Sequence, residues 1–289
     1  MRIKHRYTFD PRKPEMLSFL SRHNIMDEDP FVASDFGIYI SSFEIYSDEE
    51  NFNTVNNFMV SNNRVSLATA EYTKEELNSA KWLTIRSIWN HLHPLPDGRY
   101  YDEDNFEYLP KTYDASTIEC QKCRKGLKQK WSFIVDKDPK WGARNFFHLK
   151  WMPEELFVSK KAEDTLVANG LIGFEFWDVL RKSGKAIDGV KQLKIKGHIA
   201  EGLNKDISHS TWVCPLCNTE YFLGPKAGAN IFSTKSFEGV QADIIKGKEN
   251  IGAGGDLPMG LIFVTQKFRK VVTEAKLDKG LIFEPLTLV

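Results

Sequence analysis

Two short stretches, Cys120-Gln121-Lys122-Cys123 and Cys214-Pro215-Leu216-Cys217, contain all four cysteines of this 289-residue chain. A CxxC turn brings two thiolates close enough to bind one metal ion, and two such turns supply the four sulfurs of a closed tetrahedral zinc site. Ordinary zinc ribbons have roughly 15 to 20 residues between the turns, whereas residues 124–213 separate them here. The sequence therefore predicts a structural Zn²⁺ site with a sub-domain inserted into it. The expected ligands are Cys120, Cys123, Cys214 and Cys217.

The composition is that of a globular protein without a global electrostatic field. The 39 basic residues balance the 39 acidic ones, so any electrostatic recognition must be local. Residues 1–11 contain no apolar run of the length that a signal peptide requires, and no later segment is long and apolar enough to span a bilayer. We therefore expect a cytoplasmic protein that does not bind membranes.

The cellular compartment bears on how the cysteines are used. In reducing surroundings, paired CxxC turns are more often metal ligands than disulfides. A redox-active dithiol and free thiols are the alternatives. A thioredoxin-like site would place one CxxC at the start of a helix, but the residues after both turns are typical of turns that lead into strands: Arg124-Lys125-Gly126 and Asn218-Thr219-Glu220-Tyr221.

The N-terminal part contains one clear helix start. Thr73-Lys74-Glu75-Glu76 is a capping box, in which Thr73 and Glu76 can satisfy each other's backbone N–H groups. The apolar residues from Leu77 to about Asn90 form a broad stripe, which predicts a helix packed on both sides. A polar, Tyr-rich connection follows over residues 97–119. We expect an N-terminal α+β domain over residues 1–110 and a zinc-clasped domain over residues 111–289.

The N-terminal part also carries an unusual charge pattern. Residues 24–63 contain no Lys or Arg but eight acidic residues, and Phe36, Ile38 and Ile40 alternate with other residues as in a strand with one buried face. A solvated, loop-rich surface is one interpretation of the acidic residues. The other is a surface that docks on a basic partner protein. The candidate contact residues are Glu44, Asp48, Glu49 and Glu50.

The first CxxC turn is surrounded by basic residues, with Trp131 close by in the sequence. Basic side chains beside aromatic rings are typical of surfaces that bind single-stranded nucleic acid. The simpler interpretation is that the basic side chains decorate the turn while the aromatic rings fill a small core. The candidate nucleic-acid contacts are Lys122, Arg124, Lys125 and Lys128.

The chain contains an internal repeat. Leu156-Phe157-Val158-Ser159-Lys160-Lys161 corresponds to Ile262-Phe263-Val264-Thr265-Gln266-Lys267, and each stretch is an apolar strand that ends at a Ser or Thr suited to capping a helix. A glycine and a second apolar strand follow each predicted helix. The repeat predicts two strand-helix-strand units, over residues 156–179 and 262–286. The expected fold class is α+β, with mixed sheets, few helices and a split zinc-ribbon-like clasp.

Motifs of common catalytic sites are missing from the sequence. It contains no GxSxG, no HExxH and no cysteine outside the two CxxC turns. We therefore expect a protein that is not an enzyme.

The pattern of Thr112-Tyr113-Asp114, the first CxxC turn, Gln129-Lys130, Phe133, Pro139-Lys140-Trp141-Gly142 and the late second CxxC resembles bacterial double-CXXCG proteins. The strand-helix-strand ending is similar to that of immunity proteins of bacterial polymorphic-toxin systems. The resemblance covers roughly the last 180 residues, and Arg124 and Asn218 stand where the family pattern has glycine.

The resemblance implies a non-enzymatic protein that binds and neutralises another protein. The target would be a toxin, for an immunity protein, or a bacterial defence-system effector, for a phage-encoded inhibitor. The acidic residues fit either version, since charge complementarity speeds association with a basic target. A zinc-ribbon nucleic-acid-binding protein is the alternative.

Overall fold

The computed structural model describes residues 1–25, 29–33, 39–96, 109–150, 152–202, 209–225, 231–248 and 260–289. These residues form two compact units: Met1–Glu76 with Pro225–Asn230, and Leu77–Gly224 with Ile231–Val289. The fold class is α+β, as expected, with few helices and with both parallel and antiparallel strand pairs.

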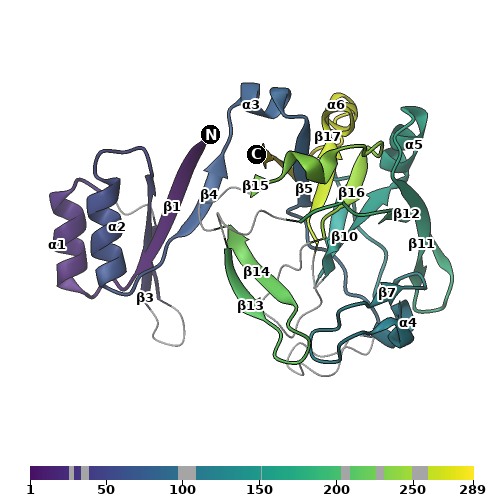
Figure 1. Cartoon of the computed structure of the whole chain (residues 1–289), viewed down its shortest axis with the longest axis horizontal. Coiled ribbons are helices and arrows are strands. Elements are labelled where there is room, and N and C mark those ends of the chain that lie inside the picture. Colours follow the sequence, from purple (N-terminus) through teal and green to yellow (C-terminus); the bar gives the residue numbers. More distant parts are fainter. Residues whose placement is uncertain are drawn as a thin grey trace. The chain divides into compact units, whose positions relative to one another are not determined.

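The first unit is an antiparallel sheet with two helices packed on one face (Figure 1). Alternate residues of β1 and β3, among them Tyr7 and Phe43, are buried against these helices. Ile40 lies in a strand, β3, as expected, but it is 49% exposed and so does not lie on the buried face that the alternation predicts. Phe36 and Ile38 lie outside the described residues. The strands pair in the order β2-β3-β1-β4. The elements are β1 (Arg2–Phe9), α1 (Pro14–Arg22), β2 (Asp29–Ala33), β3 (Tyr39–Tyr46), α2 (Phe52–Ser61) and β4 (Leu67–Glu71).

The capping box is confirmed, but the long helix expected after it is wrong. The Thr73 hydroxyl accepts from the Glu76 N–H at 3.1 Å, and the Glu76 carboxylate accepts from the Thr73 N–H at 2.9 Å. Helix α3 (Lys74–Ser79) then ends, and Trp82–Ser87 forms strand β5. All residues of this inner strand except Arg86 are buried, and its apolar residues Trp82, Leu83 and Ile85 match the stripe of a buried helix as well as a strand.

Strand β5 also explains where the units divide. It lies between β17 (Ile262–Thr265) and β18 (Leu281–Pro285), which belong to the second unit. The sequence predicts a domain boundary at residue 110, whereas the structure divides the chain at Glu76.

The two predicted strand-helix-strand units are present. The first consists of β10 (Met152–Ser159), α5 (Lys160–Ala168) and β11 (Phe174–Arg181), and the second consists of β17, α6 (Gln266–Glu274) and β18. Ser159 and Thr265 cap the helices with nearly identical backbone angles, and each hydroxyl accepts from the N–H three residues later. Leu166 and Val272 pack the helices into one shared core.

The strand order shows that the duplication is larger than this unit. One sheet contains the order β9-β10-β12-β11, and the other has the order β16-β17-β5-β18. The short parallel pair of β8 (Ile134–Val135) with β11 has a counterpart in β15 (Ile231–Phe232) with β19 (Thr287–Leu288). The other strands of these two sheets are β9 (Phe146–Leu149), β12 (Ala186–Ile195) and β16 (Ile244–Lys246).

The second unit is thus built from two similar halves, residues 82–181 and residues 186–288, which exchange their first strands. Strand β5 of the first half joins the sheet of the second, and β12 of the second half joins the sheet of the first. The fold therefore needs both halves to complete either sheet.

Equivalent backbone bridges join the two sheets at two places. Beyond β5, Asn90 is bridged to His148: the His91 N–H donates to the His148 carbonyl, and the His148 N–H donates to the Trp89 carbonyl. Beyond β12, His198 is bridged to Lys246 through the equivalent pair of bonds. The Ile199 N–H donates to the Lys246 carbonyl, and the Lys246 N–H donates to the Gly197 carbonyl. We call these the β5–β9 junction and the β12–β16 junction.

Candidate metal centre

Each CxxC turn lies at the tip of a short hairpin. The first hairpin pairs β6 (Tyr113–Asp114) with β7 (Lys128–Gln129), and the second pairs β13 (His209–Val213) with β14 (Glu220–Pro225). Both hairpins occupy the same place in the two halves, after the first strand and before the short parallel strand. The CxxC turns are therefore part of the duplication.

The backbone after each second cysteine is left-handed. Arg124 has φ 54° and Asn218 has φ 55°. This conformation costs an ordinary L-residue roughly 1–2 kcal/mol and costs glycine almost nothing. A glycine at this position of a CxxCG turn is therefore a conformational preference, and its replacement here leaves the turn geometry intact.

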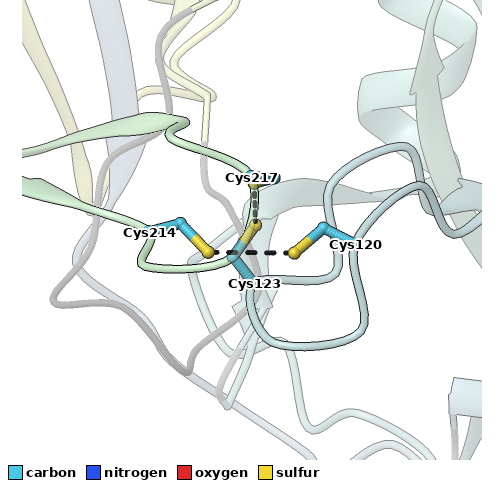
Figure 2. A group of neighbouring side chains, drawn as sticks. All are labelled: Cys120, Cys123, Cys214 and Cys217. Atoms are coloured by element: carbon cyan, nitrogen blue, oxygen red, sulfur yellow. Dashed lines mark hydrogen bonds between the residues drawn. The ribbon is translucent and has the colours of Figure 1, made fainter.

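The four thiol groups converge at one point, as Figure 2 shows. The Sγ atoms of Cys120 and Cys214 are 3.7 Å apart, those of Cys123 and Cys217 are 3.5 Å apart, and all four lie within 4.8 Å of one another. Zn–S bonds of about 2.3 Å in a tetrahedron place the sulfurs about 3.8 Å apart. Four cysteines in this arrangement fit one tetrahedral metal ion.

The cluster is shielded from solvent on most sides. Cys123 and Cys214 are fully buried, and Trp212 packs edge-on against Tyr221 beside them. The Tyr221 hydroxyl donates to the Cys123 carbonyl at 3.0 Å, which ties the second hairpin to the first turn. This contact between the hairpins could not be foreseen from the spacing of the cysteines.

The surroundings of the thiols differ. Burial raises the pKa of the Cys123 thiol, while the hydrogen bond with Thr219 lowers the pKa of the Cys217 thiol. A metal ion must displace the proton of a thiol before it can bind the sulfur. Metal binding at this site should therefore be strongly pH-dependent.

The basic residues near the first turn do not form one uniform surface. Lys125 pairs with Glu119 at 3.3 Å, whereas Lys122 and Lys128 are exposed and make no ion pair within the described ranges. Trp131 is 46% exposed, and the neighbouring Lys130 places its ammonium group 4.9 Å from the ring centroid.

The candidate acidic residues lie along β3 and in the turn that follows it. Glu44 pairs with Lys4, and Asp48 pairs with Arg2, each at 2.9 Å. The Glu49 carboxylate accepts from the Tyr46 N–H at 3.2 Å, and Glu50 is exposed. These ion pairs could not be foreseen from the sequence because the basic partners come from β1, far from the acidic stretch, where Arg2 and Lys4 alternate with apolar residues.

Comparison of the sequence with protein-family models and with curated proteins finds no match. Within the described ranges, no helix is long and apolar enough to cross a membrane.

Proposed function

We propose that this chain is a non-enzymatic inhibitor that binds another protein and whose fold is fastened by one structural zinc ion. The convergence of the four thiols carries the zinc part of the proposal. Four protein ligands fill the coordination shell of Zn²⁺ and leave no position for water or substrate, which is the mark of a structural site. The activity then resides on a surface of the protein.

Zinc is the metal that this donor set favours. Four thiolates in tetrahedral arrangement select zinc or iron–sulfur chemistry over calcium, magnesium and manganese. The proposal places the chain in the cytoplasm, where reducing conditions keep cysteines available to a metal. Metal analysis of the purified protein should give one zinc ion per chain.

Glu44 and Asp48 already form ion pairs within the chain, so we expect the partner to contact mainly the turn after β3, which contains Glu49 and Glu50. Arg2 compensates Asp48, and Lys4 is shared between Glu44 and Glu71. Glu49 and Glu50 form no ion pair in the described part of the chain, so they carry most of the uncompensated negative charge. A basic target, such as a toxin or a defence-system effector, would be attracted to this turn.

The test starts with affinity capture from the native host and mass spectrometry, followed by reconstitution with the purified target. We expect the chain to bind the target and abolish its activity. Glu49→Lys/Glu50→Lys should slow association and weaken its salt dependence. The matched control is Glu201→Lys/Glu274→Lys, which makes the same charge change at exposed positions of the second unit. A captured protein whose activity is unaffected by the chain would refute the inhibitor proposal.

A second candidate function is nucleic-acid binding through Lys122, Arg124, Lys125 and Lys128. It is favoured by the exposure of Lys122 and Lys128 beside the half-exposed Trp131. A gel-shift titration separates the candidates, since Lys122→Gln/Lys128→Gln should abolish the shift if these residues hold the nucleic acid.

A further inference from the structure

The β12–β16 junction gathers basic side chains from two strands. Lys194 belongs to β12, His198 follows it, and Lys246 and Lys248 belong to β16 and the residues just after it. His198 is bridged to Lys246 through the backbone. Partial burial lowers the pKa of His198, and the positive charges of Lys246, Lys248 and Lys194 lower it further. His198 therefore lies within electrostatic range of all three lysines.

A chain of buried and partly buried hydrogen bonds fixes two of these lysines. The Lys194 ammonium donates to Gln129 Oε1 at 2.7 Å. The side-chain amides of Gln129 and Gln192 donate a hydrogen bond to each other, both at 2.8 Å. Gln192, which is fully buried, also donates to the Glu155 carboxylate at 2.8 Å, and Lys246 donates to the other oxygen of that carboxylate at 2.6 Å. The ammonium groups are thus held in place before any ligand arrives.

The charges of this network do not balance. Glu155 compensates Lys246, but no carboxylate in the described part of the chain pairs with Lys194, and Lys248 donates to the Ala200 carbonyl. Burial raises the pKa of the neighbouring Glu154 to about 8, so this carboxyl group is mainly neutral at pH 7. Lys194 is attracted by Glu155 and Glu175, but these carboxylates already pair with Lys246 and Lys196. Its ammonium group also lies 5.3 Å from the centroid of the Trp177 ring. A partly buried ammonium group that has to share its counter-charges is costly. A bound anion would remove that cost.

The equivalent junction in the other half lacks this imbalance. The register makes Arg86 the counterpart of Lys194, and Arg86 pairs with Glu284 at 3.8 Å. His148, the counterpart of Lys246, accepts from the Ser87 N–H through Nε2 and therefore donates through Nδ1 to the Glu155 carbonyl, which makes its ring neutral. Since the same backbone junction forms without them, the fold does not require the basic residues of the β12–β16 junction.

We propose that Lys194, His198, Lys246 and Lys248 bind a phosphate group, carried either by a nucleic acid or by a free phosphate ion. Phosphate oxygens accept charge-assisted hydrogen bonds from ammonium groups. Lys194 and Lys246 supply positioned donors, and Lys248 and His198 border them. This site is distinct from the lysines of the first CxxC turn and does not depend on the proposed protein partner.

The test uses the full, zinc-loaded chain and a fluorescein-labelled 12-nucleotide RNA in an anisotropy titration over a series of salt concentrations. Lys194→Gln/Lys248→Gln should weaken binding by about tenfold or more, because the variant loses two charge-assisted donors to phosphate oxygens. The slope of log K against log salt should fall by about 0.7 for each phosphate that the variant no longer neutralises. Neither substitution leaves a buried carboxylate unpaired. Lys182→Gln/Lys185→Gln, at exposed positions of the β11–β12 hairpin, is the control with the same charge change and should bind as the wild type does.

Inorganic phosphate separates the two sources of the ligand. If the RNA does not bind but millimolar phosphate raises the melting temperature of the wild type and not of the double variant, the ligand is a free phosphate.

Failure of both ligands to bind would overturn the proposal. Equal RNA binding by the wild type and the Lys194→Gln/Lys248→Gln variant would also overturn it, and a loss confined to Lys122→Gln/Lys128→Gln would assign RNA binding to the CxxC turn. Should the double variant melt early, Lys248→Gln alone, at an exposed position, repeats the measurement.

Discussion

Cys123 and Cys217 lie 94 positions apart in the chain, yet their Sγ atoms are 3.5 Å apart. They occupy equivalent places in the two halves, as do Cys120 and Cys214. A metal ion bound by these cysteines therefore joins one half of the duplicated unit to the other.

Replacing one cysteine in either half should destabilise the second unit by a similar amount. Loss of one ligand of four removes about a quarter of the roughly 10–16 kcal/mol of structural zinc binding, or about 3 kcal/mol. Cys120→Ser and Cys214→Ser should each lower the zinc content and the melting temperature, and a chelator should have the same effect on the wild type. Unchanged melting with unchanged metal content would contradict the zinc assignment.

Glu154 should make the protein less stable as the pH rises. Burial raises its pKa from 4.5 to about 8, so between these values the folded carboxyl keeps a proton that the unfolded one has lost. The free energy of unfolding should fall through this window by at most roughly 1.4 kcal/mol per pH unit, and the loss should level off above about pH 8. Urea titrations of Glu154→Gln should lack this component, whereas the exposed control Glu274→Gln should retain it. An identical pH dependence in all three proteins would refute the argument.

Loss of either helix cap should cost more than loss of a simple cap. Ser159→Ala removes the bond to the Ala162 N–H and also the 2.8 Å bond that Ser159 donates to Asn145, so it should cost about 2 kcal/mol. Thr265→Ala removes the bond to the Phe268 N–H and also the 3.0 Å bond that Thr265 donates to the Asp243 carboxylate, so it should cost about 2 kcal/mol or more. Chemical denaturation measures both, and the exposed Thr273→Ala in α6 controls for helix propensity. A loss of only about 1 kcal/mol in either variant would show that its second bond is not stabilising.

Two glycines offer a matched comparison. A Cβ at Gly173 would lie 2.3 Å from the Ile244 carbonyl oxygen, whereas Gly170 has open space around it, and both have positive φ. Gly170→Ala should cost about 1 kcal/mol for the left-handed backbone alone. Gly173→Ala adds a backbone clash and should cost more than about 3 kcal/mol. Thermal melting of both variants measures the two losses of stability. Equal losses would contradict the prediction and would show that the Ile244 carbonyl can move away from the added Cβ.

Local signals in the sequence were enough to predict several features. The CxxC turns predicted the cysteine cluster, and Ser159 and Thr265 predicted the helix starts because capping depends on neighbouring residues. The strand β5 was missed because its apolar residues Trp82, Leu83 and Ile85 have a spacing that suits a buried helix as well as an inner strand. Its identity depends on pairing with β17 and β18, which lie far along the chain.

Long-range charge pairing was also beyond the sequence. The acidic stretch was identified, but its compensation by Arg2 and Lys4 depends on the register of β1 against β3. The network around Glu155 was missed for the same reason, since Gln129, Gln192 and Lys246 come from three separate segments.

The exchange of first strands has a consequence for synthesis of the chain on the ribosome. Strand β5 is made early, yet its neighbour β18 lies about 200 positions later, as the contact between Thr84 and Glu284 shows. Pairings over such separations form slowly because a long loop must close first. Until residue 285 has been made, β5 lacks the neighbouring strand β18, and its exposed edge is a site for aggregation. Nascent chains of this protein should therefore depend on chaperones until translation of the second half is complete.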